Sequence, residues 1–307
     1  MRLFSEIKRS KVSLFRDKTV LASKHLLEDE EVVDREEEIE RIADYIKRVL
    51  AEGSFQILFI YGSSGLGKTA ITRYVLNKLQ TENVEQALPI YVDCIDKNTR
   101  HSILSELMRF FRAFYDGKGR GCDEILEDFI SQLKRSKQIP IITLDNFDRV
   151  SDLEKLLWDL NELSTYVQCG VILISTGKFD LLNHLGNRIR SRLNIEELYF
   201  KKYDEETIFK ILKARVKSAF SNKVSDKALR LIARYSEEKG GNVKIAFNLL
   251  LNAGEIAQWE ESNKVEEFHA KEAISKLERI IINDKLREME RKRKNELKVL
   301  NQKDTSL

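Results

Sequence analysis

The sequence predicts an α/β fold in which a five-stranded parallel sheet carries helices on both faces and a small all-helical domain follows. Short apolar runs alternate with helical patterns over the first two thirds of the chain, and this alternation is typical of parallel sheets. Some runs, such as residues 171–175, are apolar almost throughout, as strands buried on both faces are. After Phe200 the strand pattern stops and only helical spacing remains.

The strands, and the helices between them, are placed by the same patterns. Asp34 is expected to cap a helix that ends at Gly53. Further helices are expected near residues 103–114 and over residues 122–133, on either side of a polar, glycine-rich break. The strands are expected at residues 57–61, 89–94, 139–144, 171–175 and 197–200.

Capping residues predict four helices beyond the sheet. Asp204, Ser225 and Asn242 are each expected to begin one, and a fourth is expected from Val265 to about Ile282. The last residues are dominated by charge and are interpreted as a solvated helix or a frayed tail, with a nucleic-acid arm as the alternative. The expected organisation is an N-terminal arm over residues 1–30, an α/β domain over 31–200, a helical lid domain over 201–283 and a charged tail over 284–307.

The most specific motif is a glycine-rich loop between the first strand and the helix after it. Residues 62–69 match the pattern G-x-x-x-x-G-K-T in the strand–loop–helix order of a phosphate-binding loop. Glycines let successive backbone N–H groups turn towards phosphate oxygens, and the helix N-terminus adds its positive dipole end. Lys68 is expected to reach the β- and γ-phosphates, and the Thr69 hydroxyl to ligate Mg²⁺. The nucleotide-binding residues predicted here are Gly62, Ser63, Ser64, Gly65, Leu66, Gly67, Lys68, Thr69 and Ala70.

A second buried strand ends in the acidic residue that the metal requires. Asp145 follows the run 139–144, and an aspartate at this place holds Mg²⁺ together with the phosphate loop. The next residue is Asn146, whose amide can orient a water molecule but cannot take its proton. We therefore predict slow ATP hydrolysis, with two alternatives: Asp148 substitutes as the base, or turnover needs no strong base.

Three further positions are candidates for sensing the γ-phosphate. Thr176 follows the fourth strand, where its hydroxyl would help to position a water molecule. Residues 188–192 contain three arginines, of which Arg192 is the candidate for an arginine finger reaching a neighbouring subunit's nucleotide; ordinary surface charge is the alternative. Lys244 lies in the first turn of a predicted helix, where a cation opposes the helix dipole, and this suggests a role facing the nucleotide.

The composition excludes several other classes of protein. The 53 basic and 50 acidic residues give a net charge of +3, which says little about partners. The three cysteines and four histidines show no metal-ligand spacing, and sparse cysteines fit a reduced compartment. No stretch approaches the ~20 apolar residues of a membrane span, and no apolar signal-peptide core is evident. A cytoplasmic protein without a membrane partner is expected, and the family resemblance described below implies association with the nucleoid.

Taken in order, these motifs resemble one family. The chain is similar to AAA+ ATPases of the initiator group, the archaeal origin-recognition and cell-division-control replication initiators. The segments that carry the resemblance are residues 14–21 (LFRDKTVL), 34–39 (DREEEI), 91–94 (YVDC), 191–193 (SRL) and 241–250 (GNVKIAFNLL).

The resemblance implies ATP and Mg²⁺ bound between the α/β base and the helical lid. It places Arg35 in a box beside the adenine, and Tyr203 and Lys244 complete the predicted nucleotide contacts. It also implies duplex DNA as a partner, through a helical insertion near residues 111–124 that carries Lys118 and Arg120.

Departures from the family pattern fall on hydrolysis rather than on binding. In this chain Asp145-Asn146 stands where the family has an acidic pair. Thr176 replaces the family's sensor asparagine, and Lys244 replaces its lid arginine. About two dozen residues follow the lid, fewer than the family's winged-helix domain of at least ~50 would need. A truncated form or a natural short paralogue is expected.

We therefore predict an ATP-dependent DNA-binding or assembly switch in replication initiation, which associates with itself or with another AAA+ initiator through the Arg192 face. The alternatives are a regulatory or defence-type nucleotide-binding module without a DNA role, and an inhibitory partner of a full-length initiator.

Overall fold

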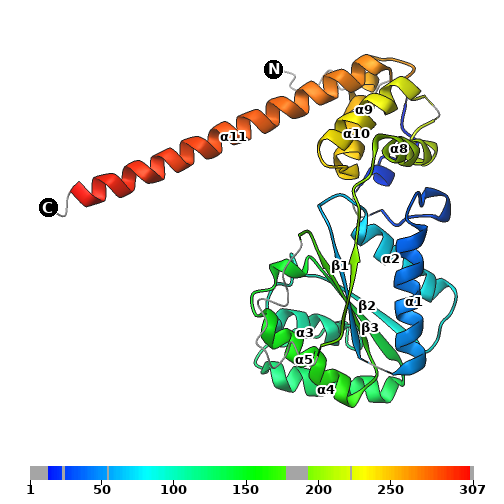
Figure 1. Cartoon of the computed structure of the whole chain (residues 1–307), viewed down its shortest axis with the longest axis vertical. Helices are drawn as coiled ribbons and strands as arrows, with labels where there is room; N and C mark the ends of the chain where they lie inside the picture. The colour runs from blue at the N-terminus through cyan, green and yellow to red at the C-terminus, as the bar shows by residue number, and fades with distance from the viewer. Residues whose placement is uncertain (1–12, 23–24, 54, 178–192, 222, 305–307) are drawn as a thin grey trace, which may run out of the picture. The chain divides into compact units, whose positions relative to one another are not determined.

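The computed structural model describes residues 13–22, 25–53, 55–177, 193–221 and 223–304 (Figure 1). The chain divides into two compact units. One is the α/β unit, Lys24–Tyr203 with Gly240–Val243; the other is the helical unit, Met1–Ser23 with Asp204–Lys239 and Lys244–Leu307.

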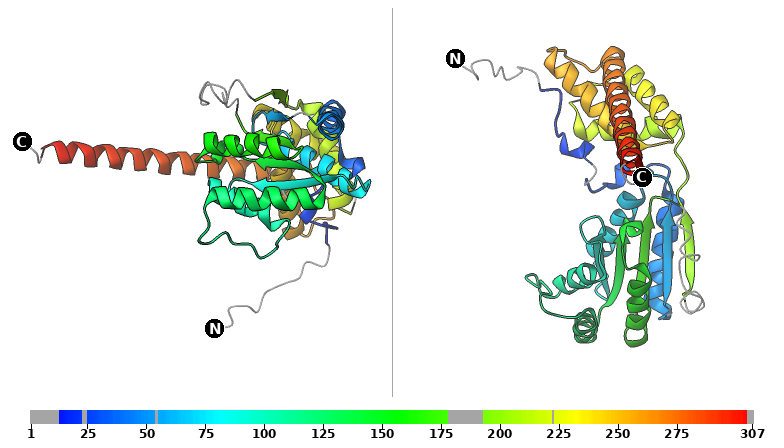
Figure 2. Two further views of the ribbon diagram at one scale, coloured as in Figure 1. Left: turned by 90° about the horizontal axis from the view of Figure 1, so that it is seen from below. Right: turned by 90° about the vertical axis from the view of Figure 1, so that its left-hand side faces the viewer.

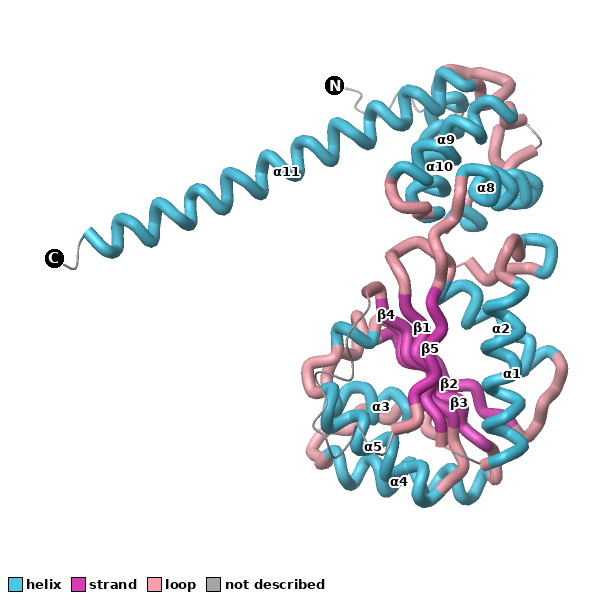
Figure 3. The backbone as a smooth tube through the Cα atoms, in the orientation of Figure 1, coloured by secondary structure: helices cyan, strands magenta, loops and turns pink. Residues whose placement is uncertain are grey.

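The α/β unit is built on a five-stranded, entirely parallel sheet with the strand order β2-β3-β4-β1-β5 (Figure 3). Its strands are β1 Gln56–Tyr61, β2 Ala87–Asp93, β3 Ile139–Asp145, β4 Gly170–Ser175 and β5 Ile195–Tyr199. The predicted fold class is thus confirmed, with each strand within two residues of its expected place. Because the strands are parallel, their carboxyl ends meet at one edge of the sheet, and the register places Asp93 of β2 opposite Asp145 of β3.

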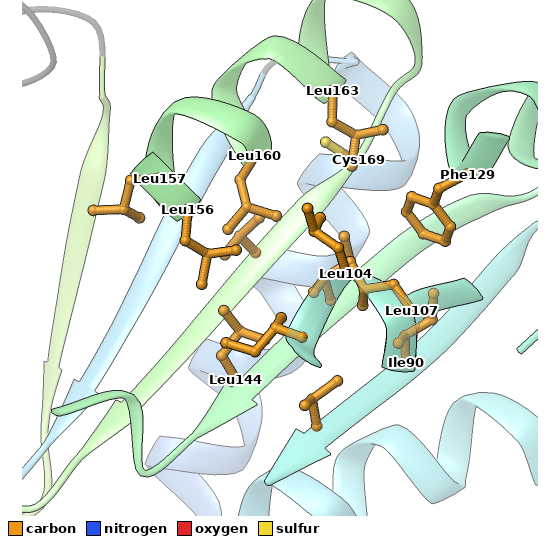
Figure 4. Packing of buried hydrophobic residues seen from close by; sticks show 14 of the residues in the cluster. Ile90, Leu104, Leu107, Phe129, Leu144, Leu156, Leu157, Leu160, Leu163 and Cys169 are labelled. Carbon is orange, nitrogen blue, oxygen red and sulfur yellow. The ribbon is translucent and has the colours of Figure 1, made fainter. Parts of the chain in front are cut away.

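Helices cover both faces of this sheet. Helices α1 (Glu36–Glu52) and α2 (Lys68–Thr81) lie on one face, and α3 (Arg100–Arg109), α4 (Cys122–Ser136) and α5 (Leu153–Tyr166) lie on the other. The core under α3, α4 and α5 joins leucines of α5, Phe129 of α4 and Leu104 and Leu107 of α3 to the apolar strands (Figure 4). No element was predicted over residues 153–166, which form α5.

The start of α1 corrects the predicted cap. Asp34 has a positive φ of 55°, and the residue at the N-cap position is Arg35, whose side chain makes no capping hydrogen bond. Its guanidinium instead donates to the backbone oxygen of Lys201 at 2.7 Å, so a tertiary contact overrides the local capping preference. Gly53 ends α1 in the left-handed conformation, as predicted.

The predicted helical insertion near residues 111–124 is wrong. Helix α3 ends at Arg109, residues 110–121 form turns, and α4 begins at Cys122. Gly117 and Gly119 have positive φ angles of 67° and 74°, which a right-handed helix cannot contain. A Cβ on Gly117 would lie 2.3 Å from the Ser105 hydroxyl oxygen, so the turn is also fixed by its packing.

The helical unit contains four α-helices among its described residues: α8 Glu205–Ala219, α9 Asp226–Glu238, α10 Val243–Trp259 and α11 Glu267–Asp304. The predicted caps of α8 and α9 are confirmed, because Asp204 accepts from the Thr207 N–H at 2.7 Å and Ser225 from the Ala228 N–H at 3.2 Å. Residues 13–22 pack onto this unit through the ring of Phe15, whose centroid lies 4.5 Å from that of Phe220.

Helix α11 includes both the helix expected over residues 265–282 and most of the charged tail. It runs without a break to Asp304 (Figure 2), which confirms the solvated-helix interpretation of residues 284–304 over the frayed tail. Its side chains Ile282, Leu286 and Met289 are exposed. Across the described residues, no helix combines the length and the apolar character that crossing a membrane requires.

Candidate nucleotide-binding site

The loop between β1 and α2 has a backbone that its glycines make possible. Gly62, Gly65 and Gly67 have φ angles of +148°, +79° and +87°, values that residues with a side chain rarely adopt. A Cβ on Gly65 would lie 1.8 Å from the side-chain oxygen of Asn242, and one on Gly62 would lie 2.7 Å from the backbone oxygen of Phe200. The glycines therefore serve both the turn and the close packing around it.

Lys68 lies inside this loop. Its ammonium is buried and donates to the backbone oxygens of Gly62 at 2.6 Å and Ser63 at 2.8 Å. Because Lys68 is also the first residue of α2, the cation and the positive end of the helix dipole coincide. This arrangement holds positive charge where a phosphate-binding loop needs it.

Thr69 and Asp145 meet beside Lys68. The Thr69 hydroxyl donates to Asp145 Oδ2 at 2.7 Å, and the Tyr91 hydroxyl donates to the same oxygen at 2.6 Å. Burial first, and then the charge of Asp145, raise the pKa of the Tyr91 phenol, which therefore remains a proton donor. Tyr91 was not predicted from the sequence.

A hydroxyl and a carboxylate are the hard oxygen ligands that Mg²⁺ prefers. The described residues contain no group of three or more histidine, cysteine, aspartate or glutamate side chains that could hold a metal by themselves. This donor set fits a Mg²⁺ ion that shares its coordination with water and phosphate oxygens.

Asn146 is tethered by its side chain. It adopts the left-handed conformation with φ 55° and ψ 41°, and its backbone N–H donates to Asp145 Oδ1 at 2.8 Å. Its side-chain Nδ2 donates to Asp93 Oδ1 at 2.9 Å, and the same oxygen accepts from the Ile95 N–H at 3.0 Å. Asp93 is thus a carboxylate of this site that the sequence analysis did not identify. Asp148, the alternative base, accepts from the Ser175 hydroxyl at 3.2 Å.

Thr176 lies beside the phosphate loop. It is exposed, and together with Gly62 and Ser63 it lines a hollow of about 380 Å³ whose other walls are Tyr61, Gly177 and Tyr199. The structure therefore brings this predicted residue to the loop. The arginine cluster that includes Arg192 falls outside the described residues.

Arg35 and Tyr203 form a pair next to the loop. Arg35 Nε donates to the Tyr203 hydroxyl at 2.7 Å, and the guanidinium lies 4.0 Å from the centre of the Tyr203 ring. A Cβ on Gly67 would lie 3.1 Å from the Tyr203 hydroxyl, which places the tyrosine against the loop. Burial raises the pKa of Tyr203, and the charge of Arg35 opposes this rise.

The first residue of α10 is hydrogen-bonded to the phosphate loop. The Val243 N–H donates to the backbone oxygen of Gly65 at 3.0 Å, and both residues belong to the α/β unit. Lys244 is the next residue and belongs to the helical unit. Its predicted contact with nucleotide stays a prediction.

The two predicted DNA-binding cations lie in the turns between α3 and α4. Lys118 is exposed, with its Nζ 3.9 Å from an Asp116 oxygen. Arg120 pairs with Asp128 and lies 3.6 Å from a Glu124 oxygen. Both cations therefore have carboxylate neighbours on the protein.

Comparison with known proteins gives matches over both units. A model of the AAA domain matches residues 52–184, and a model of the Cdc6 AAA+ ATPase-type lid domain matches residues 209–275. The chain is 30% identical over 273 residues to the ORC1-type DNA replication protein 1 of Methanosarcina acetivorans, covering 87% of this chain and 66% of that protein. It is 29% identical over 285 residues to the protein of the same name in Archaeoglobus fulgidus, covering 91% and 69%. The chain thus spans about two thirds of the length of these relatives.

Solved structures show the same fold. The Aeropyrum pernix ORC1 protein in complex with DNA matches with a TM-score of 0.77 and 25% identity, over 88% of this chain and 71% of that one. The Aeropyrum pernix ORC2 protein in ADPNP–ADP complexes matches with a TM-score of 0.74 and 20% identity, over 85% and 72%.

Proposed function

Because this chain belongs to the AAA+ ATPases of the archaeal origin-recognition and cell-division-control group, with an AAA domain and a Cdc6-type lid, we propose that it is an ATP-dependent switch in DNA replication initiation. In this proposal the protein binds ATP with Mg²⁺, hydrolyses it slowly, and changes its DNA binding or its assembly with the nucleotide state. The ORC1-type relatives named above motivate the replication role.

One observation carries the proposal: the groups for holding ATP converge, while the position for activating water carries an amide. Lys68 would neutralise the β- and γ-phosphates, and Thr69 and Asp145 would hold Mg²⁺. When bound, the metal neutralises charge that develops on the phosphates. Asn146, held by Asp93, cannot accept a proton from the attacking water, and Thr176 would only orient that water.

In this proposal the remaining predicted contacts would complete the site. Arg35 and Tyr203, fixed to each other at 2.7 Å, would form part of the wall beside the adenine. Lys244, at the start of α10, would sense the γ-phosphate from the lid. Arg192 of one subunit would reach the nucleotide of a neighbouring copy or of another AAA+ initiator. The arginine's role is tested by Arg192→Ala, which should slow hydrolysis in the assembled protein and leave nucleotide affinity unchanged.

The central experiment measures bound nucleotide and single-turnover hydrolysis on the purified protein. We expect ATP binding that Lys68→Ala weakens at least tenfold, and hydrolysis well below the 1–100 s⁻¹ range typical of phosphoryl-transfer enzymes such as kinases. Retention of unhydrolysed ATP through purification would support both parts. Failure to bind ATP, or hydrolysis within that range, would contradict the proposal.

DNA binding is tested by its salt dependence. Each phosphate contact should contribute about −0.9 to the slope of log affinity against log salt on duplex DNA. Lys118→Ala should weaken binding and lower the slope by about one contact, while nucleotide affinity stays unchanged.

The second candidate function is a nucleotide-binding regulatory module that does not bind DNA. The observation that favours it is the pairing of Arg120 with Asp128 and Glu124, because a cation occupied by protein carboxylates contributes less to phosphate binding. Absence of duplex binding at low salt with ATP present would establish this candidate over the first.

A further inference from the structure

Tyr91 and Asp145 are joined across two neighbouring strands. Strands β2 and β3 pair in parallel with Tyr91 opposite Thr143 and Asp93 opposite Asp145. This register brings the Tyr91 hydroxyl within 2.6 Å of Asp145 Oδ2, which is the same oxygen that accepts the Thr69 hydroxyl at 2.7 Å.

The Asp145 carboxylate is consequently held by three donors. Tyr91 and Thr69 donate to Oδ2, and the Asn146 backbone N–H donates to Oδ1 at 2.8 Å. Thr69 and Asp145 are themselves the proposed metal-holding pair, so their hydrogen bond must adapt when the ion binds. Tyr91 approaches from β2, outside that pair, and can keep its hydrogen bond to the carboxylate throughout.

The Tyr91 side chain is partly enclosed. The residue is half-buried in β2, and the Arg73 guanidinium lies 5.5 Å from the centre of its ring. Its hydroxyl donates to the Asp145 carboxylate from outside the metal-holding pair. Partners that orient metal ligands in this way typically change metal affinity by about 10- to 100-fold when removed.

We propose that Tyr91 is a positioning residue for magnesium: its hydroxyl holds Asp145 in the orientation that lets the carboxylate act with Thr69 on the ion. This inference rests on the proposed ATP-binding function. The proposal predicts that the Tyr91 hydroxyl increases the affinity for Mg²⁺. It predicts no effect of this hydroxyl on nucleotide binding when the metal is absent.

The test compares Tyr91→Phe with a matched control. Tyr91→Phe removes the hydroxyl and keeps the ring, so no cavity forms. Tyr74→Phe is the control, because the Tyr74 hydroxyl also donates to a carboxylate in the same unit, Asp29 at 3.0 Å, away from the phosphate loop. Binding of a fluorescent ATP analogue is measured first in EDTA and then against increasing Mg²⁺.

For Tyr91→Phe we expect a rise of about tenfold or more in the Mg²⁺ concentration that gives half of the metal-dependent change in analogue binding. The affinity for the analogue in EDTA should stay within twofold of wild type. Tyr74→Phe should change neither quantity. A Mg²⁺ midpoint within twofold of wild type, or an equal loss with and without Mg²⁺, would overturn the inference. Failure of the wild-type protein to bind the analogue at all would instead overturn the proposed function, so the two failures are distinct.

Discussion

Replacing Asn146 with glutamate is the direct way to restore a general base, but the structure predicts that this change alone falls short. Asn146 Nδ2 lies 2.9 Å from Asp93 Oδ1, so the introduced glutamate would face a carboxylate on the neighbouring strand. Converting Asp93 to asparagine at the same time would recreate a carboxylate–amide pair with its members exchanged. The comparison of interest is therefore Asn146→Glu against the double variant Asp93→Asn/Asn146→Glu.

The size of the effect follows from the short distance. Two unit charges about 5 Å apart interact by about 3 kcal/mol at an effective dielectric constant of 20. Asp93 and Asn146 are both only partly buried, so solvent screening reduces this to about 1–2 kcal/mol. A penalty of about 1.4 kcal/mol makes the ionised glutamate about tenfold less populated in the position that the Asn146 side chain occupies beside Asp93, and the rate of hydrolysis falls by the same factor.

The assay is single-turnover hydrolysis of radiolabelled ATP with protein in excess, run on all four members of the cycle. General-base assistance contributes about 10²- to 10⁴-fold, so the double variant should exceed wild type by about 100-fold or more. Asn146→Glu alone should reach about a tenth of the double variant's rate. Asp93→Asn alone should stay as slow as wild type, because it adds no base.

Nucleotide affinity within twofold of wild type in each protein would show that the site remains intact. If Asn146→Glu alone matched the double variant, the Asp93 contact would not control this position. If neither variant hydrolysed ATP faster than wild type, the missing carboxylate at position 146 would not be the reason for slow turnover.

Two further predictions concern the loop and the thiols. Gly65→Ala should lower nucleotide affinity at least tenfold, because a Cβ there would lie 1.8 Å from the Asn242 side-chain oxygen. Gly119 has a similar positive φ but open space around it, so Gly119→Ala serves as the control. It should lower the free energy of unfolding by only about 1 kcal/mol, measured with denaturant, and leave nucleotide affinity unchanged. Burial raises the pKa of Cys94 and of Cys169 to about 12 from 9.0, so both thiols should resist a colorimetric thiol reagent at pH 8 until the protein unfolds. Because the folded state keeps these protons above pH 9.0, the free energy of unfolding should fall between pH 9.0 and about 12, by up to about 1.4 kcal/mol per pH unit for each thiol. Reaction of Cys94 or Cys169 in the folded protein would contradict the assigned burial. So would a free energy of unfolding that does not change across this pH range.

The strands were predictable because a buried parallel strand leaves a local signal. Each is a short apolar run bounded by polar residues, and the five runs lie within two residues of the observed strands. The cap at Asp34 failed for a non-local reason, since Arg35 is held by Lys201, far away in the sequence. The helical insertion implied by the resemblance is wrong because residues 110–121 form turns in which two glycines have positive φ, and these glycines lie in the polar break that the residues themselves predicted between the two helices.

The phosphate loop was determined by the sequence itself. Its glycines, Lys68 and Thr69 are consecutive or nearly so, and their geometry follows from the local backbone between a strand and a helix. Tyr91 and Asp93 lie in a segment that carries the family resemblance, but the segment does not assign them to the site, because an alternating strand residue looks the same whether or not it reaches a neighbour's carboxylate. Only the tertiary structure placed β2 beside β3 in the register that sets Tyr91 against Asp145 and Asp93 against Asn146. Strand order depends on how distant segments pack, and that packing decided which groups surround the metal and water positions.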